Sequence, residues 1–478
     1  MWTSCYKAIA NCNNYLEEFT GLTFSEYEQI SDYEAEMYRY NNYQYEVRFL
    51  RAYFYFNLVR QYGDVPFTDH VLSTTEVNTL TRKPAQEVFD WIIKECDEIK
   101  DLIIPDYNNL GALVPSGESA ETGRANKRTV LALKARTALY AASPLFNSHQ
   151  EGSQGYKELW YRAAKANKEL IETCEDAGMR LIDDYENLWD AKSYSIAIDE
   201  LIFGCRAIRA TNSFEKYNFP VGLENCRGGN CPTQTLVDAY ELKDGGERPD
   251  KKADYDKNKP YYEGRDPRFE KTIAKNGDTK WPNWNETALE TYQGGANAEP
   301  LSGGTPTGYY LKKYCQTSIN TTTAKPTTDN HTWIIYRLGE FYLNYAEALF
   351  KYLGTAYATN NEFPIPANEM VSKTRRRTKV NMPKFPAGLD NKLWWEKYQN
   401  ERMVELAFEG HRFWDVRRWK EGDKHFSSID AMKIYKSGDS YSYRRVTVNR
   451  QWDDKMYFFP IPQSEKAKNP NLTQNPGW

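Results

Sequence analysis

Hydrophobic residues in the first third of the chain recur every three to four positions, the spacing that places them on one face of a helix. Over residues 44–62 this pattern aligns Val47, Leu50 and Phe54, and Gly63 follows as a stop signal. The same spacing predicts further helices over residues 2–19, 84–99, 127–142 and 156–174. We therefore expect the first third of the chain to be a series of helices.

These helices are predicted to pair as antiparallel hairpins, at spacings near those of two-helix solenoid repeats. Small residues such as Ala135 and Ala138 would let a neighbouring helix come close. Later in the chain, residues 341–352 and 391–409 read as a more distant helix pair, the second closed by Gly410. The predicted class is all-α, with tetratricopeptide-like helical hairpins and an irregular, loop-rich lobe.

The loop-rich lobe is predicted from the middle of the chain, where the helical period is lost. Residues 176–330 are rich in Gly, Asn, Thr, Pro and Lys, and only short pieces such as 200–210 could be strands. The clustered aromatic residues there argue against a disordered linker. We accordingly divide the chain into a helical region, 1–175, the lobe, 176–330, and a second helical region with an extended tail, 331–478. Pro460 and Pro462 exclude a central strand in that tail.

Composition narrows the function classes. The chain has 478 residues, a net charge of -4 and one short basic run at 373–379, which we interpret as solvated or ion-paired, so nucleic-acid binding is not expected. Aromatic residues make up 15% of the chain. They would serve either a large amphipathic core or a platform for a flat, hydroxylated ligand. No apolar run is long enough to span a bilayer, and the start has no signal-peptide pattern.

The best catalytic candidate is the segment 401–419. Glu401, Glu405 and Glu409 are four positions apart, with His411 and several arginines close behind. Carboxylates beside arginines form charge-assisted pairs readily, and such pairs perturb carboxylates without any chemistry. We interpret the segment as a structural ion-pair network and predict no catalytic residues.

Metal and cofactor sites are not predicted either. The sequence has no zinc, phosphate-loop or nucleophile-elbow motif. Asp254, Asp256 and Asp266 offer oxygen ligands to calcium, but their spacing does not match an EF-hand, so a solvated acidic loop is favoured. Cys226 and Cys231 form a local pair, either as a disulfide or as free thiols.

Five segments, in this order, resemble signatures of the SusD/RagB-like proteins. They are "FLRAYFYFNLVRQYGDVPF", "GRANKRTVLALKARTALYAASPLF", "YRLGEFYLNYAEAL", "ERMVELAFEGHRFWDVRRW" and "FFPIPQSE…NPNLTQNPGW". The resemblance covers nearly the whole chain. It implies an all-α body of tetratricopeptide-like hairpins with an irregular lobe. It also implies a non-enzymatic surface lipoprotein of Bacteroidetes outer membranes, which captures glycans over a SusC-like, TonB-dependent transporter.

The start of the chain departs from that family pattern. Family members usually begin with a signal peptide and a lipid-modified cysteine, whereas this sequence starts inside the first helix at "MWTSCYKAIANCNN". Cys5 has no apolar segment before it, so its context is not that of a lipidation site. The resemblance therefore implies outer-membrane anchoring through a lipid group outside this sequence.

Glycan binding would need exposed rings for the apolar faces of sugars and polar side chains for their hydroxyls. We predict such a site in three loops, with the alternative that the rings only pin these loops to the body. The candidate contacts are Trp281, Asn283, Trp284, Asn285, Tyr292 and Gln293, then Tyr217, and finally Phe67, Asp69 and His70.

The function predicted from the sequence is thus a non-catalytic, cell-surface glycan-binding protein that passes oligo- or polysaccharide to a TonB-dependent transporter. One alternative is a tetratricopeptide-type scaffold that binds a peptide or protein in its concave face. A glycoside hydrolase is the other, and it would release reducing sugar from an oligosaccharide.

Overall fold

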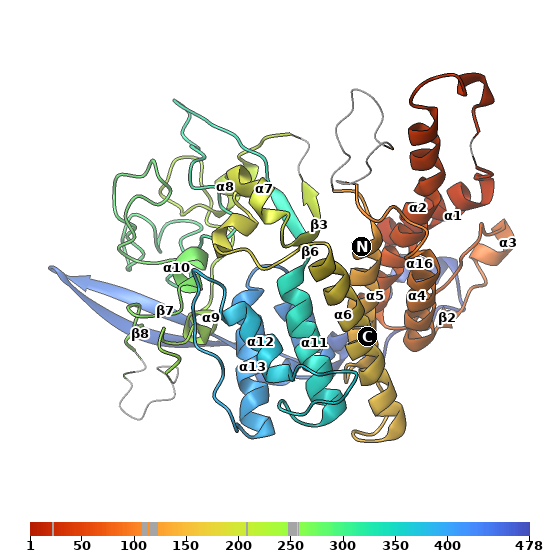
Figure 1. Ribbon diagram of the computed structural model, residues 1–478. Helices are drawn as coiled ribbons and strands as arrows, with labels where there is room; N and C mark the ends of the chain where they lie inside the picture. The colour runs from red at the N-terminus through yellow and green to blue at the C-terminus, as the bar shows by residue number, and fades with distance from the viewer. Residues whose placement is uncertain (22, 108–112, 114–122, 207–208, 247–255, 257) are drawn as a thin grey trace.

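The computed structural model describes residues 1–478 except for 22, 108–112, 114–122, 207–208, 247–255 and 257 (Figure 1). Its body is a layer of helices, each packed on the one before it in the chain. In order of packing they are α1 (Trp2–Glu18), α2 (Tyr33–Tyr62), α4 (Ala85–Ile99), α5 (Lys127–Ala142), α6 (Gln154–Asp176), α11 (Leu338–Leu353) and α12 (Ala367–Arg375). The predicted all-α class is confirmed.

Two further helices close the C-terminal side of the body. In α13 (Asn391–Glu405) the ring of Trp394 lies 4.6 Å from that of Phe350 on α11, so the predicted distant pairing is confirmed. The helix ends at Glu405, and Glu409 lies in the turn before α14 (Arg412–Arg418), not on the helix as expected.

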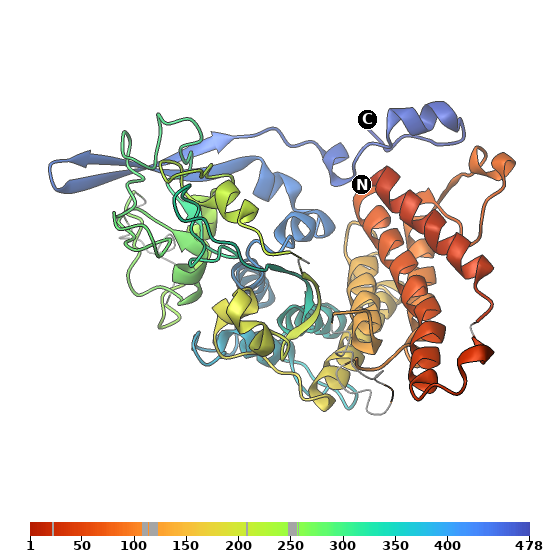
Figure 2. The ribbon, with the colours of Figure 1, turned by 90° about the horizontal axis from the view of Figure 1, so that it is seen from above.

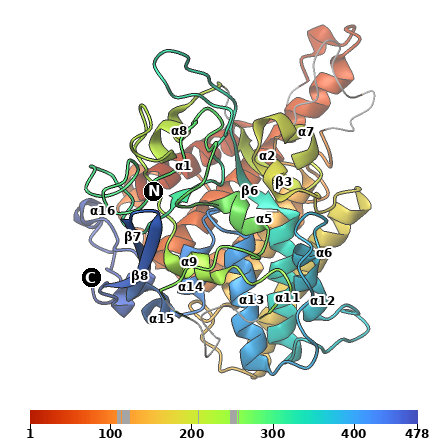
Figure 3. The ribbon, with the colours of Figure 1, turned by 90° about the vertical axis from the view of Figure 1, so that its left-hand side faces the viewer.

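The start of α2 was mispredicted by the apolar pattern. The helix begins at Tyr33, before the predicted position 44, and its first turns project beyond the other helices (Figures 1 and 3). In this extension Ala35, Arg39 and Asn42 are the buried residues, so it shows almost no apolar stripe. It therefore carries little of the periodic signal from which helices are predicted.

The lobe is inserted between α6 and α11. The chain enters it along β3 (Leu201–Arg206) and leaves along β6 (Thr332–Arg337), and the two strands pair antiparallel. The predicted strand within 200–210 is confirmed. We call this two-strand ladder the neck. The short helix α7 (Tyr194–Ala197) precedes the neck in the chain. Between the two strands of the neck the chain forms short elements and loops, namely α8 (Ser213–Asn218), α9 (Gln234–Ala239), α10 (Arg268–Thr272), β4 (Ile273–Ala274) and β5 (Tyr310–Leu311).

A long β-hairpin, which was not predicted, projects from the lobe side of the molecule (Figure 2). Its strands, β7 (Ser428–Ser437) and β8 (Ser440–Asn449), pair along their whole length around Gly438. Gly438 has a φ of +57°, and a Gly-Asp turn between alternating residues is a recognised hairpin signal. The rest of the chain forms small elements: β1 (Val65–Pro66) pairs with β2 (Arg82–Lys83), and α3 (Thr74–Val77), α15 (Gly422–Phe426) and α16 (Gln463–Lys468) are short helices.

One hydrophobic core unites the helices on both sides of the insertion. Phe49 of α2, Leu139 of α5 and Phe341 of α11 are all fully buried in it. Smaller clusters, such as the one around Phe219 and Trp281, lie within the lobe. Within the described part of the chain, each helix is too short or too polar to cross a lipid bilayer.

Candidate functional site

The three glutamates of segment 401–419 are buried and paired. Glu405 accepts hydrogen bonds from Arg337 at 2.8 Å and from Arg268 at 2.7 Å. Glu401 and Glu409 are bound by Arg268 and Arg337 in the same way, at 2.6 and 2.7 Å. The remaining cations of this network, which joins the lobe to the body, are Lys313, Arg375 and Arg377. The predicted ion pairing is confirmed, including that of the basic run.

The charges around Glu405 outweigh the effect of its burial. Burial alone would raise the pKa of this carboxyl, but Arg337, Arg377 and Arg268 hold the pKa well below its ordinary value. Lys313 behaves differently: burial lowers its pKa to about 8, although Glu409 opposes the shift. A carboxylate held this strongly in its ionised form is a poor proton donor. The arrangement is that of a structural network.

A second buried network lies between α11, α13 and α14. Arg418 forms a two-pronged pair with Glu347, both contacts being 2.6 Å, and its Nε donates to Asp415 at 2.9 Å. Arg402 donates to the other oxygen of Asp415 at 2.8 Å. Because Arg402 and Glu405 are both on α13, that helix contributes to both networks.

The structure corrects the expectation that the tryptophans of loop 281–295 are exposed. Trp281 is only 6% exposed, and its ring meets Phe219 edge to face at 5.5 Å. Trp284 is half-buried and donates to the carbonyl of Ile319 at 2.8 Å. Asn285 is buried as well. These side chains pin the loop, because a hydrophobic ring gains more by packing on Phe219 than by facing water.

Trp281→Phe is accordingly expected to destabilise the lobe. The smaller ring leaves part of the Trp281 space empty beside Phe219, at a cost of about 1–2 kcal/mol. Urea denaturation followed by fluorescence and circular dichroism measures the loss. The exposed neighbour variant Asn283→Ala serves as control, with little change expected. An unchanged midpoint for Trp281→Phe would contradict the packing role.

The other predicted contacts are dispersed over the molecule. Asn283 and Gln293 are exposed, and Tyr292 lies against the hairpin, its ring 5.9 Å from that of Tyr441. Tyr217 is 52% exposed. The third group lies at the opposite end of the molecule: Phe67 packs on Trp91, while Asp69 and His70 are exposed. A glycan role for these residues stays a prediction, and the structure does not bring them into one site.

The described residues of the acidic loop form no built cation site. Asp254 lies outside the described residues, Asp256 is exposed, and Asp266 is buried against Arg268 at 2.7 Å. No cluster of three or more potential metal-binding side chains occurs in the described part of the chain. Cys226 and Cys231 are separate thiols, and the Sγ of Cys226 contacts Thr321 at 3.2 Å.

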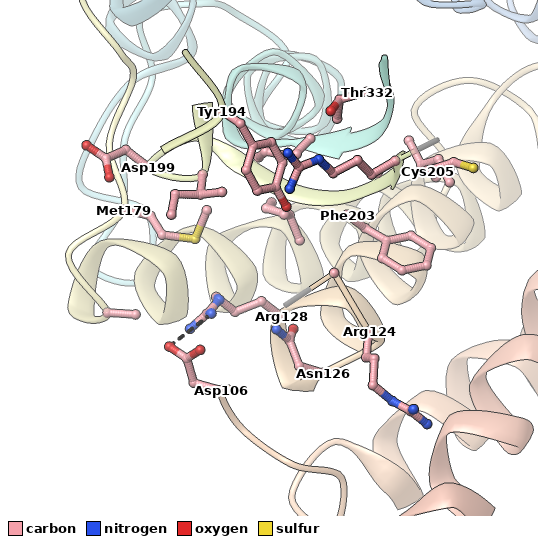
Figure 4. Close-up of a pocket in the computed structure, with 18 of the residues that line it drawn as sticks. Asp106, Arg124, Asn126, Arg128, Met179, Tyr194, Asp199, Phe203, Cys205 and Thr332 are labelled. Carbon is pink, nitrogen blue, oxygen red and sulfur yellow. Dashed lines mark ion pairs between the residues drawn. The ribbon is translucent and has the colours of Figure 1, made fainter. Parts of the chain in front are cut away.

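A cavity of about 580 Å³ opens beside the neck (Figure 4). Strand β3 forms one wall, and the start of α5 and the turn after α6 form others. The guanidinium of Arg206 lies 4.1 Å from the centre of the Tyr194 ring, and the described residues give it no carboxylate partner. On the opposite side Arg128 is paired with Asp106 at 3.1 Å. Stacked rings and guanidinium donors of this kind can hold a polar ring.

A row of aromatic rings extends from this cavity to the projecting end of α2. Arg124, which points away from the cavity in Figure 4, covers the ring of Tyr43 at 4.4 Å. Tyr43 meets Tyr40 at 5.5 Å, and Tyr40 meets Phe24 at 6.0 Å. Tyr40 and Phe24 are 36% and 39% exposed. We call Arg124, Tyr43, Tyr40 and Phe24 the aromatic row.

Glu46 holds the side chain of Arg124 in place between the cavity and the aromatic row. This buried carboxylate accepts from Arg124 at 3.0 Å and from the hydroxyl of Tyr107 at 2.5 Å. Burial and the charge of Glu46 raise the pKa of Tyr107, so its hydroxyl remains a donor. The sequence analysis missed this site. A usable signal was present, because tyrosines three positions apart on a polar helix share an exposed face.

Two family models match the sequence. Residues 200–478, more than half of the chain, match the model described as the SusD family. Residues 1–139 match a second model, described as "Starch-binding associating with outer membrane".

Individual relatives agree with these matches. SusD-like protein P2 of Formosa agariphila is 24% identical over 488 residues, which span 100% of this chain and 80% of the relative. A solved SusD-like protein from Bacteroides fragilis is 26% identical with a TM-score of 0.76, over 100% of this chain and 85% of that one. A SusD-like carbohydrate binding protein from the same species is 24% identical with a TM-score of 0.74, over 99% and 85%. These structures share the fold described above.

Proposed function

Because this chain belongs to the SusD family, we propose that it captures oligo- or polysaccharide at the cell surface, using the aromatic row and the adjoining cavity. The observation that carries the proposal is that contacting rings and a guanidinium extend from Phe24 to Arg124, and that Arg124 lines the same cavity as the stacked pair Arg206 and Tyr194. Sugar rings stack their apolar faces on aromatic rings, and arginines donate to their hydroxyls.

The cavity is large enough for one or two sugar units, and the aromatic row can contact further sugar units of the same glycan. A volume of about 580 Å³ is within the range of small-molecule sites. The row is open to solvent, so a polysaccharide can pass along it without its ends being enclosed. Exposed stacking and hydrogen bonds give modest net energy in water, so we expect modest affinity per site.

The bound glycan is proposed to pass to a TonB-dependent transporter in the outer membrane. The family description that mentions outer-membrane association supports this, together with the resemblance of the five sequence segments. We further propose that the protein is lipid-anchored and non-catalytic. The engagement of the glutamates of segment 401–419 by buried cations supports the second point. Co-purification of the tagged protein with a transporter from outer membranes tests the partnership.

The double variant Tyr40→Ala/Tyr43→Ala is expected to weaken glycan binding about tenfold or more, because two stacking surfaces are lost. Ligands are first found on an oligosaccharide array that includes starch fragments, and affinities are then measured by titration calorimetry. Tyr435→Ala, which removes an exposed tyrosine from the hairpin, is the matched control and should bind normally.

Three outcomes would count against these proposals. Full affinity in the double variant would mean that glycan binds elsewhere, with the loop around Asn283 and Gln293 as the next candidate. Failure of the parent protein to bind any glycan would remove the capture function itself. An assay for reducing sugar on the same samples tests the non-catalytic role, because sustained release would identify a hydrolase.

A further inference from the structure

A second cavity, of about 380 Å³, lies among α9, the end of α13, α14 and α15. It shares no lining residue with the cavity at the neck. Much of its wall is apolar, formed by Leu236, Met403, Phe408, Phe413 and Phe426. Phe413 is 40% exposed and stands where the cavity meets solvent. A wall of this kind suits a ligand with an apolar face.

The charged lining of this cavity has one sign. Arg412 and Arg450 line it together with His411 and His425, and no acidic residue occurs among the described lining residues. Arg450 is exposed, so its charge is available at the rim. The cavity therefore combines an apolar wall with positive charge.

Arg412 has no carboxylate partner among the described residues, although much of its guanidinium is buried. Its Nη2 donates to Nδ1 of His425 at 3.2 Å, and Nε2 of His425 then donates to Glu421 at 2.9 Å. Since arginine can only donate, this places the histidine proton on Nε2. The Nη1 of Arg412 is buried without any hydrogen-bond partner.

Several other buried arginines of this region bind carboxylates, whereas Arg417 on the same helix has no carboxylate partner among the described residues and donates to the carbonyls of Met456 and Phe413 at 3.2 Å. Arg268, Arg337 and Arg418 each bind carboxylates at 2.6–2.9 Å. Arg60 also lacks a carboxylate, but the ring of Trp414 covers it at 4.3 Å. Burial lowers the pKa of Arg412, although the charges of Asp415 and Glu421 oppose the shift, so the cost of burying this guanidinium is only partly compensated. An incoming carboxylate would remove that cost through charge-assisted hydrogen bonds.

The neighbouring space restricts where an anion can lie. A cavity of about 310 Å³ on the other side of Arg412 is lined by Asp238, Glu396 and Asp430. Lys424 lines the same cavity, and Arg445 pairs with Asp238 at 2.6 Å, but carboxylates outnumber the cations in its lining. An anion is therefore favoured on the apolar side of Arg412, with its body against the phenylalanines.

We propose that the cavity among α9, α13, α14 and α15 binds a small carboxylate carried on a ring, such as a uronic acid or an aromatic acid. The carboxylate pairs with Arg412, one face of the ring packs on the wall that includes Phe408 and Phe413, and Arg450 adds charge at the rim. This site is separate from the aromatic row and does not depend on the proposed glycan capture.

Titration calorimetry with glucuronate and with benzoate tests the proposal, using glucose and benzyl alcohol as the matched neutral probes. At least one acid should bind while its neutral counterpart does not. Arg412→Gln should weaken that binding about tenfold or more, and Arg450→Gln about threefold. Arg376→Gln removes an exposed arginine that does not line the cavity and should leave binding unchanged. The acid that binds identifies the ligand class.

The proposal is overturned if neither acid binds, or if both arginine variants retain the parent affinity. A thermal melt of each variant separates loss of binding from loss of folding. If Arg412→Gln does not fold, Arg450→Gln decides the matter, because its exposed side chain can be changed without disturbing the core. Unchanged affinity in that variant, with no weakening at high salt, would then refute the site.

Discussion

Glu405→Gln is expected to lower the free energy of unfolding by about 3–5 kcal/mol, the usual cost of removing one partner from a buried ion pair. The substitution keeps the size of the side chain but removes its charge. Three fully buried cations would then lose one of the carboxylates that balance their positive charge, namely Arg268, Arg337 and Arg377. Glycan binding should survive wherever the fold does, because Glu405 lines neither the cavity nor the aromatic row.

Urea denaturation of the parent and the variant measures this loss. Glu396→Gln is the matched control, since Glu396 is an exposed glutamate on the same helix, and its effect should be within about 0.5 kcal/mol. A Glu405→Gln protein that is as stable as the parent but no longer binds glycan would contradict the structural role. It would return segment 401–419 to consideration as a ligand or catalytic site.

Acid should reveal the same network in the parent protein. The folded-state pKa of Glu405 lies well below its ordinary value of 4.5, and the pKa values of Glu401 and Glu409 are also lowered, against the opposing effect of burial. The stabilisation from these groups is therefore complete above about pH 4.5 and declines as the pH falls toward their folded-state pKa values. The parent should lose stability more steeply than Glu405→Gln below that pH.

Arg418→Met is expected to be about as damaging, at about 3–5 kcal/mol. Methionine replaces much of the volume but none of the charge. Glu347 would keep its hydrogen bonds from Tyr398 and Trp419 but lose both contacts to the guanidinium. Its pKa, now held low by Arg418 against the effect of burial, would rise.

Thermal and urea denaturation at neutral pH test this expectation. Arg180→Met is a suitable control, because Arg180 and its partner Asp199 are largely exposed and such pairs contribute little. A loss of similar size in both variants would indicate that general surface charge, and not the buried pair, controls stability. The comparison should be repeated at acidic pH, where protonation of Glu347 would partly relieve the Arg418→Met protein.

Local patterns in the sequence were sufficient to predict many of the helices of the body. The helix over residues 127–142 has the predicted bounds, because its small inner residues and its ends are encoded within a single segment. The ion pairing of Glu401 and Glu405 was predictable from their spacing beside arginines. Its partners were not, since Arg268 and Arg337 reach α13 only through the folded lobe and neck.

The candidate functional surface depends on contacts between residues far apart in the chain, and the local spacing of residues in the sequence does not reveal such contacts. The Asn- and Gly-rich loop around Trp281 predicts an exposed ring that could contact ligand. In the structure, Phe219, which is far from Trp281 in the sequence, covers that ring. The neck cavity exists because β3 pairs with β6 across more than a hundred residues. The helix face that carries Tyr40 and the half-buried Tyr43 could have been recognised, but Arg124, which lies between them and the cavity, could not.

The neck also defines how this protein can diversify. Since β3 and β6 are paired, the segment between them leaves and rejoins the helical body at neighbouring strands. A different segment could therefore replace it without moving the two points of attachment. The contact beneath it is electrostatic: Arg268 of the lobe pairs with Glu401 of α13, and Lys313 of the lobe pairs with Glu409 in the turn after that helix. A transplanted lobe would therefore have to supply two cations at those places, whatever ligand its loops recognise. The paired strands of the neck and these two cations are thus the features that any replacement lobe would need in order to join the same helical body.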